Sequence, residues 1–399
     1  MTRFCIAEWL TAYRKLRRPA LAAAPALGGL LLAGAAAAQA LPASGAPAAT
    51  AAAAPASPAA SAPPPIRTKA MGQIALPRLT GRLHAADIGL VINTADPLSV
   101  RIGEHYITAR GLAPEQVLRL DVPVRGALTR EEFDSLRARI DQHFGRHIQA
   151  LALAWSEPYA VECNSITGAL ALGVDSELCK NSCGASRPSR YFNSASSKPY
   201  TDLGMRPSML LAARNVAQGK ALIDRGVAAD GALVLRGRPP VTAMFLTTDD
   251  VPRRVRTVLY PPAGFLPGPR IDIRIAPEAE LASAKRVLIA ITGSERVKLD
   301  PAMDWAPGGL GDHLTSTGGD LFGNHGQSTV LAWLDAGATA SHGAVSEPCN
   351  HLQKFPHPQV LMGHYMQGAT AIEAYWKSVA WPQQSLFVGE PLAAPFAAR

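Results

Sequence analysis

The chain alternates between short apolar runs and longer amphipathic stretches, and this alternation predicts its secondary structure. In the first part of the chain these segments follow one another at 87–92, 98–109, 116–120, 129–144 and 147–154. A short run of branched apolar residues is typical of a buried strand, whereas apolar residues at helical spacing predict a helix. The resulting β-α-β-α-β order predicts parallel strands joined by right-handed crossovers.

The rest of the chain continues this order after a long irregular stretch at 156–210 that is rich in Ser, Asn, Pro and Cys. Helices are expected at 210–225, 327–335, 360–367 and 370–378, and strands at 242–246, 286–291, 338–341 and 385–388. Seven glycines from Gly308 to Gly326 predict a loop with unusual backbone angles. These elements together predict a three-layer α/β sandwich with a mostly parallel sheet, formed by one domain over 67–399.

The first 40 residues have the layout of a secretory signal peptide. Four basic residues within 14–18 precede an apolar run at 20–38, and Ala38-Gln39-Ala40 fits the small-x-small site after which signal peptidase cleaves. An uncleaved membrane anchor is the alternative, but the high Ala and Gly content makes the run only weakly hydrophobic. We therefore expect cleavage after Ala40 and a periplasmic or secreted protein that keeps no transmembrane segment.

Composition separates the start of the chain from the rest. Residues 41–66 consist almost entirely of Ala, Pro, Ser and Gly, which predicts a disordered spacer because such a segment cannot bury a core. The formal net charge of +8 is divided equally between the first 66 residues and the remainder. No dense run of Lys and Arg with interleaved aromatic residues is present, so nucleic-acid binding is not indicated, and no other partner is predicted.

The cysteines indicate disulfide bonds. Cys5 lies in the signal segment, and the remaining four are Cys163, Cys179, Cys183 and Cys349. An even number in an exported protein favours two disulfides, and zinc is the alternative, although the spacing lacks C-x-x-C pairs. Cys163 and Cys349 each follow a Ser-Glu-Pro tripeptide after an expected strand. If these strands are neighbours, a Cys163–Cys349 bridge and a local Cys179–Cys183 bridge are predicted, with the other pairings left open.

Polar residues after the expected strands are the first candidates for a functional site, because ligands of parallel α/β sheets bind beyond the carboxyl ends of strands. We predict one cleft lined by Asn93, Asp96, Glu157, Asp175, His342 and Glu347. In this prediction the histidine and the two glutamates perform acid–base chemistry, and the other three residues bind the ligand. The alternative is that the two glutamates only cap turns before proline.

The C-terminal third offers further candidates. His313 is a second possible base, and the turn at 314–319 can present the Ser316 hydroxyl or backbone amides to an anion. A purely structural turn is the alternative for this segment. The sequence has no G-x-S-x-G, Walker A or H-E-x-x-H motif, so we expect neither a metal site nor a cofactor.

Several segments resemble a family of uncharacterised exported bacterial proteins. They are 161–172 (VECNSITGALAL), 187–193, 312–319 (DHLTSTGG), 337–350 (GATASHGAVSEPCN), 354–358 (KFPHP), 372–379 (IEAYWKSV) and 389–392 (GEPL). The resemblance covers about 85–396. It implies no activity, because none is established for that family.

The C-terminal part is also similar to gingipain-type cysteine peptidases, which have a caspase-like α/β sheet. The GATAS strand, the Ile-Glu-Ala helix and the strand ending in Gly-Glu-Pro-Leu carry this resemblance. In those peptidases the catalytic His lies in a Gly-His-Gly turn, and the Cys lies at the end of the next strand. Here 292–319 contains no cysteine, Ser316 or Thr317 occupies about that place, and His313 is not in a Gly-His-Gly turn. The peptidase dyad is therefore not matched.

Two hypotheses about function follow. One is a hydrolase that uses His342 or His313 together with Glu157, Asp175 or Glu347. The other is a non-catalytic binding or scaffold protein with a polar cleft at the strand ends, which the missing dyad favours. The two differ in whether an acid, a histidine and a hydroxyl converge within hydrogen-bonding distance.

Overall fold

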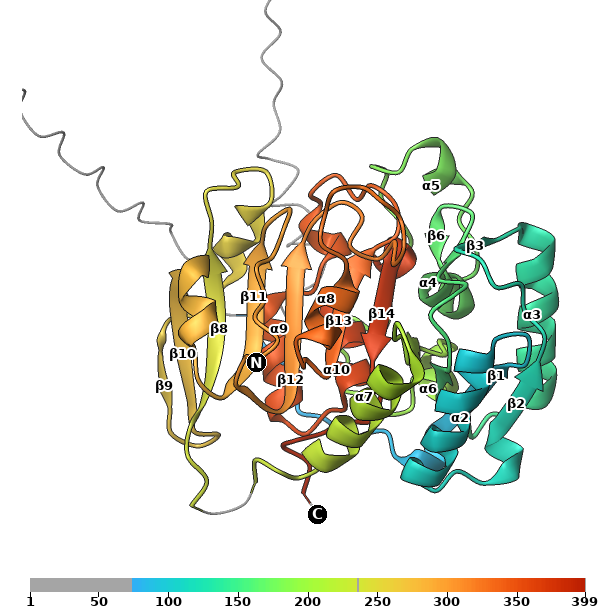
Figure 1. The fold of residues 1–399 in the computed structure, drawn as a ribbon, viewed down its shortest axis with the longest axis horizontal. Coiled ribbons are helices and arrows are strands. Elements are labelled where there is room, and N and C mark those ends of the chain that lie inside the picture. Colours follow the sequence, from blue (N-terminus) through green and yellow to red (C-terminus); the bar gives the residue numbers. More distant parts are fainter. Residues whose placement is uncertain (1–73, 235–236, 399) are drawn as a thin grey trace, which may run out of the picture. The chain divides into compact units, whose positions relative to one another are not determined.

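The computed structural model describes residues 74–234 and 237–398, so the expected signal peptide at 1–40 and the expected spacer at 41–66 lie outside the described residues. The described residues belong to one compact unit. This unit is a three-layer α/β sandwich around an 11-stranded, mostly parallel sheet, which confirms the predicted fold class (Figure 1). The strand order is β2-β1-β4-β7-β14-β13-β12-β11-β8-β10-β9.

The large sheet contains both short and long strands. They are β1 (Ile88–Asn93), β2 (Val117–Leu120), β4 (Ala150–Leu153), β7 (Ser208–Leu210), β8 (Val241–Thr247), β9 (Gly264–Leu266), β10 (Ile271–Pro277), β11 (Val287–Gly293), β12 (Trp305–Leu314), β13 (Ala340–Ala344) and β14 (Ser385–Gly389). A separate small sheet contains β3 (Ala127–Leu128), β5 (Ala160–Val161) and β6 (Asn164–Ser165).

Helices cover both faces of the large sheet. They are α2 (Pro97–Arg110), α3 (Arg130–His143), α4 (Ile166–Leu172), α5 (Glu177–Lys180), α6 (Pro199–Leu203), α7 (Val216–Ala229), α8 (Val330–Asp335), α9 (Pro358–Met366) and α10 (Ala371–Ser378). Alternate residues of a strand point to opposite faces. In β1, Leu90 therefore packs in one apolar cluster with α2, α9 and α10, and Val91 packs in another with α3, α4 and α8.

The sheet changes direction at β14. This strand pairs antiparallel with β13 and parallel with β7, and β7 in turn is parallel to β4 and, through it, to β1. Strands β8, β11, β12 and β13 are parallel to one another. The first group of strands consequently runs opposite to the second. A single edge that carries all the carboxyl ends, on which the predicted cleft depends, does not exist in this sheet.

The prediction of a glycine-rich loop from Gly308 to Gly326 is wrong over its first part, because Gly308, Gly309 and Gly311 lie within strand β12. A side chain at Gly309 would collide with the Trp305 ring, and one at Gly311 would collide with the Trp333 ring. The glycines therefore make room for two large tryptophans against the strand. Their local preference for turns is outweighed by this packing.

The helix expected at 210–225 begins later than predicted. Ser208–Leu210 forms β7, and the helix starts after Asn215, whose side chain accepts a hydrogen bond from the Gln218 amide at 3.0 Å. Asn is a strong N-cap because its side chain satisfies a free amide of the first turn. Apolar residues continue from the strand into 211–213, and this continuity concealed the boundary.

Candidate functional site

The first two predicted ligand-binding residues hold local structure. Asn93 is fully buried, and its amide exchanges hydrogen bonds with Val122, accepting from the backbone N–H at 3.0 Å and donating to the carbonyl at 2.9 Å. Asp96 is the N-cap of α2, where its Oδ1 accepts from the Leu98 amide at 2.9 Å. These contacts account for both side chains without a ligand.

Glu157 lies near a carboxylate cluster at the surface. Partial burial, followed by the charges of Asp96 and Asp320, raises the pKa of Glu157 above its ordinary value. Asp320 accepts a hydrogen bond from the Tyr159 hydroxyl at 2.5 Å and lies 2.6 Å from His325 Nε2. The structure thus brings Asp96 and Glu157 near each other, together with Asp320, which the sequence analysis did not single out.

His342 does not line a surface cleft. It is fully buried in β13, with Nδ1 3.3 Å from Asp312 Oδ2, and the rings of Phe355 and Phe387 lie beside it. Asp312 also forms an ion pair with the buried Arg256. Burial alone would raise the pKa of Asp312, but Arg256 and His342 outweigh it and hold that pKa below its ordinary value. Arg256, Asp312 and His342 thus form a buried polar network in the core, away from any surface cleft.

Glu347 and Asp175 each cap a local turn. Glu347 Oε1 accepts a hydrogen bond from the Cys349 amide at 2.7 Å, and Asp175 Oδ1 accepts one from the Glu177 amide at 3.1 Å. Neither hydrogen bond connects these carboxylates with His342. For Glu347, this geometry corresponds to the turn-capping alternative.

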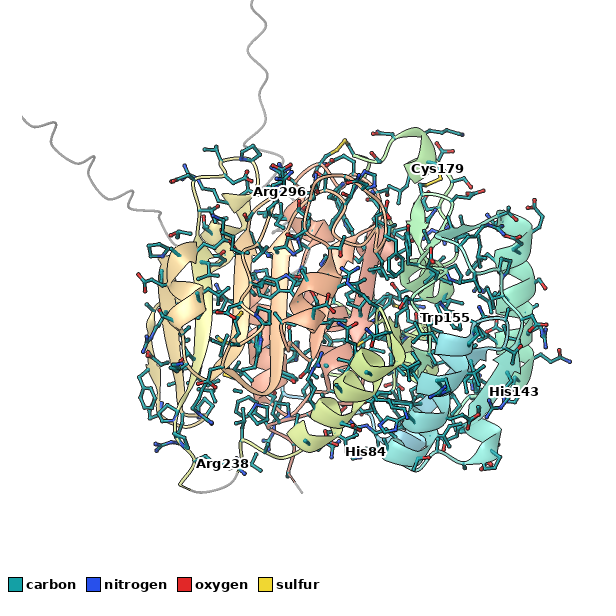
Figure 2. The ribbon with its side chains drawn as sticks, viewed as in Figure 1. His84, His143, Trp155, Cys179, Arg238 and Arg296 are labelled. Atoms are coloured by element: carbon teal, nitrogen blue, oxygen red, sulfur yellow. A yellow bond between two sulfur atoms is a disulfide. The ribbon has the colours of Figure 1, made fainter. Side chains whose placement is uncertain are left out.

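Two disulfides are present, as predicted, but the predicted pairing is wrong. The bonds are Cys163–Cys179 and Cys183–Cys349, with Cα–Cα distances of 5.2 and 5.1 Å. The two Ser-Glu-Pro loops do meet, since Ser346 donates a hydrogen bond to the Cys163 carbonyl at 2.7 Å. Cys179 lies in α5 and Cys183 lies just after it. The segment 179–183 is therefore bonded to the loop at Cys163 and to the loop at Cys349, and its two cysteines are not bonded to each other. Cys179 is labelled in Figure 2.

His313 is held in place by neighbours that occupy both ring nitrogens. Its Nδ1 accepts a hydrogen bond from the Trp333 indole at 2.9 Å, and its Nε2 lies 2.9 Å from the Ser328 carbonyl oxygen. Burial lowers the pKa of His313 to about 4. The ring is therefore neutral at ordinary pH, and neither nitrogen is free to act as a base toward Ser316.

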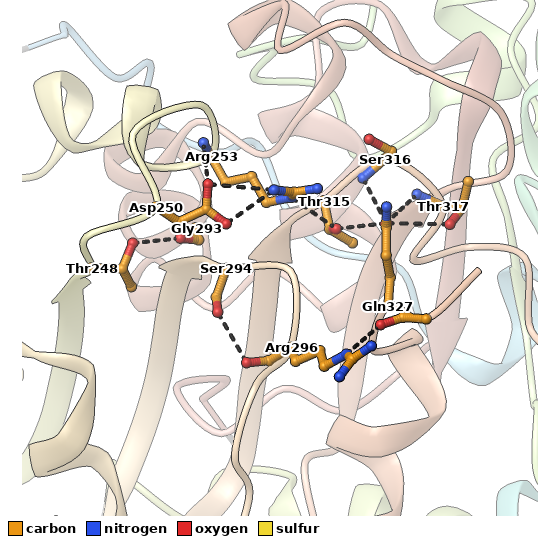
Figure 3. Close-up of polar contacts among 11 residues, drawn as sticks. Thr248, Asp250, Arg253, Gly293, Ser294, Arg296, Thr315, Ser316, Thr317 and Gln327 are labelled. Atoms are coloured by element: carbon orange, nitrogen blue, oxygen red, sulfur yellow. Dashed lines mark hydrogen bonds and ion pairs between the residues drawn. The ribbon is translucent and has the colours of Figure 1, made fainter. Parts of the chain in front are cut away.

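In the turn that follows β12, four hydrogen-bond donors converge on one acceptor atom. Gln327 Oε1 accepts from the Thr315 hydroxyl at 2.7 Å, from the Ser316 and Thr317 amides at 3.1 Å each, and from the Thr317 hydroxyl at 3.2 Å. Figure 3 shows these contacts at the end of the strand, with the Ser316 hydroxyl directed away from Gln327. We refer to Thr315, Ser316, Thr317 and Gln327 as the turn site.

The position of the turn site is fixed by segments whose backbones pack closely at two glycines. A Cβ atom on Gly343 of β13 would lie 2.5 Å from backbone atoms of Gly318 and Gly319, and the Gly319 amide donates to the Ala344 carbonyl at 2.8 Å. A Cβ atom on Gly293, at the end of β11, would collide with the Arg253 carbonyl. The small size of glycine at these two positions thus lets three segments meet beside the turn.

Arg253 borders the turn site. Its Nε donates to the Thr315 hydroxyl at 3.3 Å, and its Nη1 lies 3.0 Å from Asp250 Oδ2 (Figure 3). Asp250 therefore offsets part of the positive charge that Arg253 brings. The segment that carries Gln327 is held by Arg296, whose Nε donates to the Gly326 carbonyl at 2.5 Å.

The turn site combines residues that the sequence analysis found with one that it missed. The prediction that this turn presents backbone amides identified the segment, and Gln327 is the acceptor that the segment surrounds. The helix expected at 327–335 begins only at Val330, so Gln327 lies in the loop before α8 and not in a helix. A lone glutamine in a loop carries no pattern by which it could have been recognised. Within 74–234 and 237–398, no group of three or more His, Cys, Asp or Glu side chains is arranged to hold a metal ion.

No helix of the described residues has the length and apolarity that a membrane span requires. Comparison of the chain with protein-family models, with curated proteins and with solved structures finds no match.

Proposed function

We propose that this is an exported binding protein that holds a carboxylate group of its ligand in the turn site. The observation that supports it is the convergence of four donors on the single Gln327 Oε1 atom. An amide oxygen has two lone pairs and cannot fully satisfy four donors, whereas the two oxygens of a carboxylate offer about four acceptor positions. In this proposal Gln327 occupies the place of the ligand and must move away for binding.

The kind of donor also favours a carboxylate. Successive backbone amides form concave sites for anions, and peptide carboxylates are recognised in this way. Hydrogen bonds to an ionised group are roughly twice as strong as neutral ones. Ser316, Thr317 and Gln327 are partly exposed, and only Thr315 of the turn site is buried. A ligand can therefore reach the turn from solvent.

A hydrolase is the less favoured alternative. The caspase-like fold, which we retain as a proposal, is supported by the neighbouring parallel strands β11 and β12, since the peptidase dyad follows two consecutive strands. The residues after these strands are Ser294 and Thr315, neither of which is a His or a Cys. His313 is occupied by Trp333 and Ser328, and His342 lies in the core, so neither activates a hydroxyl of the turn.

Export is supported by chemistry within the folded unit. Disulfides persist in oxidising compartments, and two are formed here. The proposed location is the periplasm or the exterior of the cell.

Replacing Gln327 by glutamate tests the preference for an anion without any added ligand. The side chain keeps its length, and the Nε2 group that is lost donates to no residue among those the structure describes. We expect Gln327→Glu to stabilise the protein by about 1–2 kcal/mol at pH 7, because the new carboxylate accepts from the same donors. The turn would lower the pKa of this carboxylate, so the gain is present above about pH 4.3 and is lost as the pH falls further.

Gln367 provides a control without a cluster of donors, because its Oε1 accepts one backbone hydrogen bond, from the Leu79 amide at 3.1 Å, and its Nε2 donates to the Pro77 carbonyl at 3.2 Å. Urea unfolding of Gln367→Glu at pH 7 should show no increase in the free energy of unfolding. A loss of stability in Gln327→Glu at pH 7 that is recovered near pH 4 would contradict the proposal.

A further inference from the structure

A cavity lies beside the amino ends of β4 and β7 and shares no residue with the turn site. Its volume is about 370 Å³, and its lining includes Arg137, Arg146 and Arg206. Among the described residues that line it, Asp141 is the only acidic one. The cavity therefore contains an excess of positive charge.

Arg206 is fixed in the wall of this cavity. Its side chain is 5% exposed, and its guanidinium lies over the Tyr200 ring at 3.7 Å from the centroid. Nε donates to the Ile148 carbonyl at 3.2 Å, and Nη2 donates to the Phe144 and Gly145 carbonyls at 3.3 and 3.2 Å. The carbonyls hold the planar group in one orientation, so little side-chain entropy remains to be lost when it meets a ligand.

The one carboxylate does not neutralise the cations around it. Asp141 lies 3.4 Å from Arg206 Nη1 and 3.6 Å from Arg137 Nε, at the long end of the range for ion pairs, and it is itself 53% exposed. Arg146 has no acidic partner among the described side chains. Burial lowers the pKa of Arg206, which reflects a charge that its surroundings do not fully compensate.

The remaining wall is apolar. Ile140, Leu151 and Leu170 contribute side chains from α3, β4 and α4. Small-molecule sites are typically of about 300–1,000 Å³ and combine an apolar wall with a few placed polar groups. The planar guanidinium fork matches the geometry of carboxylate and phosphate.

We propose that this cavity binds a small molecule in which an oxyanion group is joined to an apolar body of a few carbon atoms. The oxyanion would lie between Arg137, Arg146 and the Nη1 group of Arg206, which keeps one N–H beyond its hydrogen bond to Asp141. The apolar body would contact Ile140 and Leu170. Such a ligand site is independent of the proposed carboxylate binding at the turn.

Backbone NMR spectroscopy of the secreted chain tests this proposal with hexanoate as the probe, compared with 1-hexanol and inorganic phosphate. Binding in the cavity is read from the Thr201 and Gly204 amides, whose residues line it, so binding at the turn site does not contribute. We expect hexanoate to bind at least tenfold more tightly than either of the other two compounds. Equal binding of hexanol would contradict the role of the arginines, and equal binding of phosphate would contradict the role of the apolar wall.

The double variant Arg137→Gln/Arg146→Gln removes two cations and leaves the structural Arg206 in place. It should weaken hexanoate binding at least tenfold while its melting temperature stays close to that of the wild type. Arg139→Gln is the control, because Arg139 is an exposed residue of α3 that does not line the cavity. Unchanged hexanoate affinity in the double variant, or no response of Thr201 and Gly204 to hexanoate, would overturn the proposal.

Discussion

Many ionisable residues of this protein serve the fold at the scale of single side chains. Glu390 is fully buried and accepts hydrogen bonds from Tyr106 at 3.1 Å and from Arg110 at 2.9 and 2.6 Å. Asp312 joins Arg256 and His342 in the core. Residues in the GEPL, DHLTSTGG and GATAS segments thus contribute buried polar contacts, which are costly to leave unsatisfied.

The buried His313 leads to a prediction about acid stability. The folded protein keeps this ring neutral down to about pH 4, whereas an unfolded chain takes up the proton near pH 6.5. Between these values the unfolded state binds more protons, so stability is complete above about pH 6.5 and falls as the pH approaches 4. We expect His313 to account for about 2–3 kcal/mol of this loss by pH 4.5.

Urea unfolding at pH 7 and pH 4.5 measures this effect. His313→Gln can still accept a hydrogen bond from Trp333 and donate one to Ser328, but it cannot take up the proton. The difference in unfolding free energy between pH 7 and pH 4.5 should therefore shrink by about 2–3 kcal/mol in this variant. His147→Gln is the control, because His147 is exposed, and its unfolding free energy should change between pH 7 and pH 4.5 as much as that of the wild type. An undiminished difference in His313→Gln would show that another group causes the acid loss.

At the scale of elements, local patterns predicted the helices better than the sheet. The helices expected at 98–109 and 129–144 are observed as Pro97–Arg110 and Arg130–His143, because cap and periodicity signals are local. Strand β12 was missed because its glycines read as a loop, whereas Gly309 makes room for Trp305 of the same strand and Gly311 for Trp333 of α8, which reaches the strand only when the chain folds. The reversal at β14 is also a property of pairing, and no single segment encodes it.

The same reversal explains why the candidate site was predicted only in part. The amides of 314–319 follow from a local run of Ser, Thr and Gly, and the structure places them in a turn as expected. The common cleft required all strand ends to meet, and this condition fails when two groups of strands run in opposite directions. Gln327 becomes significant only through its contacts with residues ten to twelve positions earlier.

The contact between β13 and the turn leads to a prediction for Gly343. A methyl group at this position would lie 2.5 Å from the backbone of Gly318 and Gly319, which cannot rotate away as a side chain can. We expect Gly343→Ala to destabilise the protein by about 1–3 kcal/mol and to shift the Ser316 and Thr317 amide resonances. Gly268→Ala is the control, because a Cβ atom there meets no atom within 4 Å. Equal stability of the two variants would contradict the proposed packing of the turn.

At the scale of the whole molecule, disulfides connect parts of the chain that are far apart in sequence. Cys183–Cys349 spans 166 residues and Cys163–Cys179 spans 16. In the loop-entropy description, the longer closure stabilises the fold by about 5 kcal/mol and the shorter by about 3 kcal/mol. Together they fasten the irregular segment around α5 to the loop after β13, and they suit a protein that functions in an oxidising compartment.

The central claim is that the folded unit offers a carboxylate site at the turn after β12. Titration of the protein with acetate, followed by NMR at the Ser316 and Thr317 amides, tests it most directly. Gln327→Ala removes the internal occupant, so this variant should bind acetate at least about fivefold more tightly than the wild type, and more tightly than it binds the neutral acetamide. Adding Thr315→Val and Thr317→Val should abolish the response. If acetate leaves both amides unmoved in Gln327→Ala, or if acetamide binds equally well, the turn is only a structural element and the proposed function is wrong.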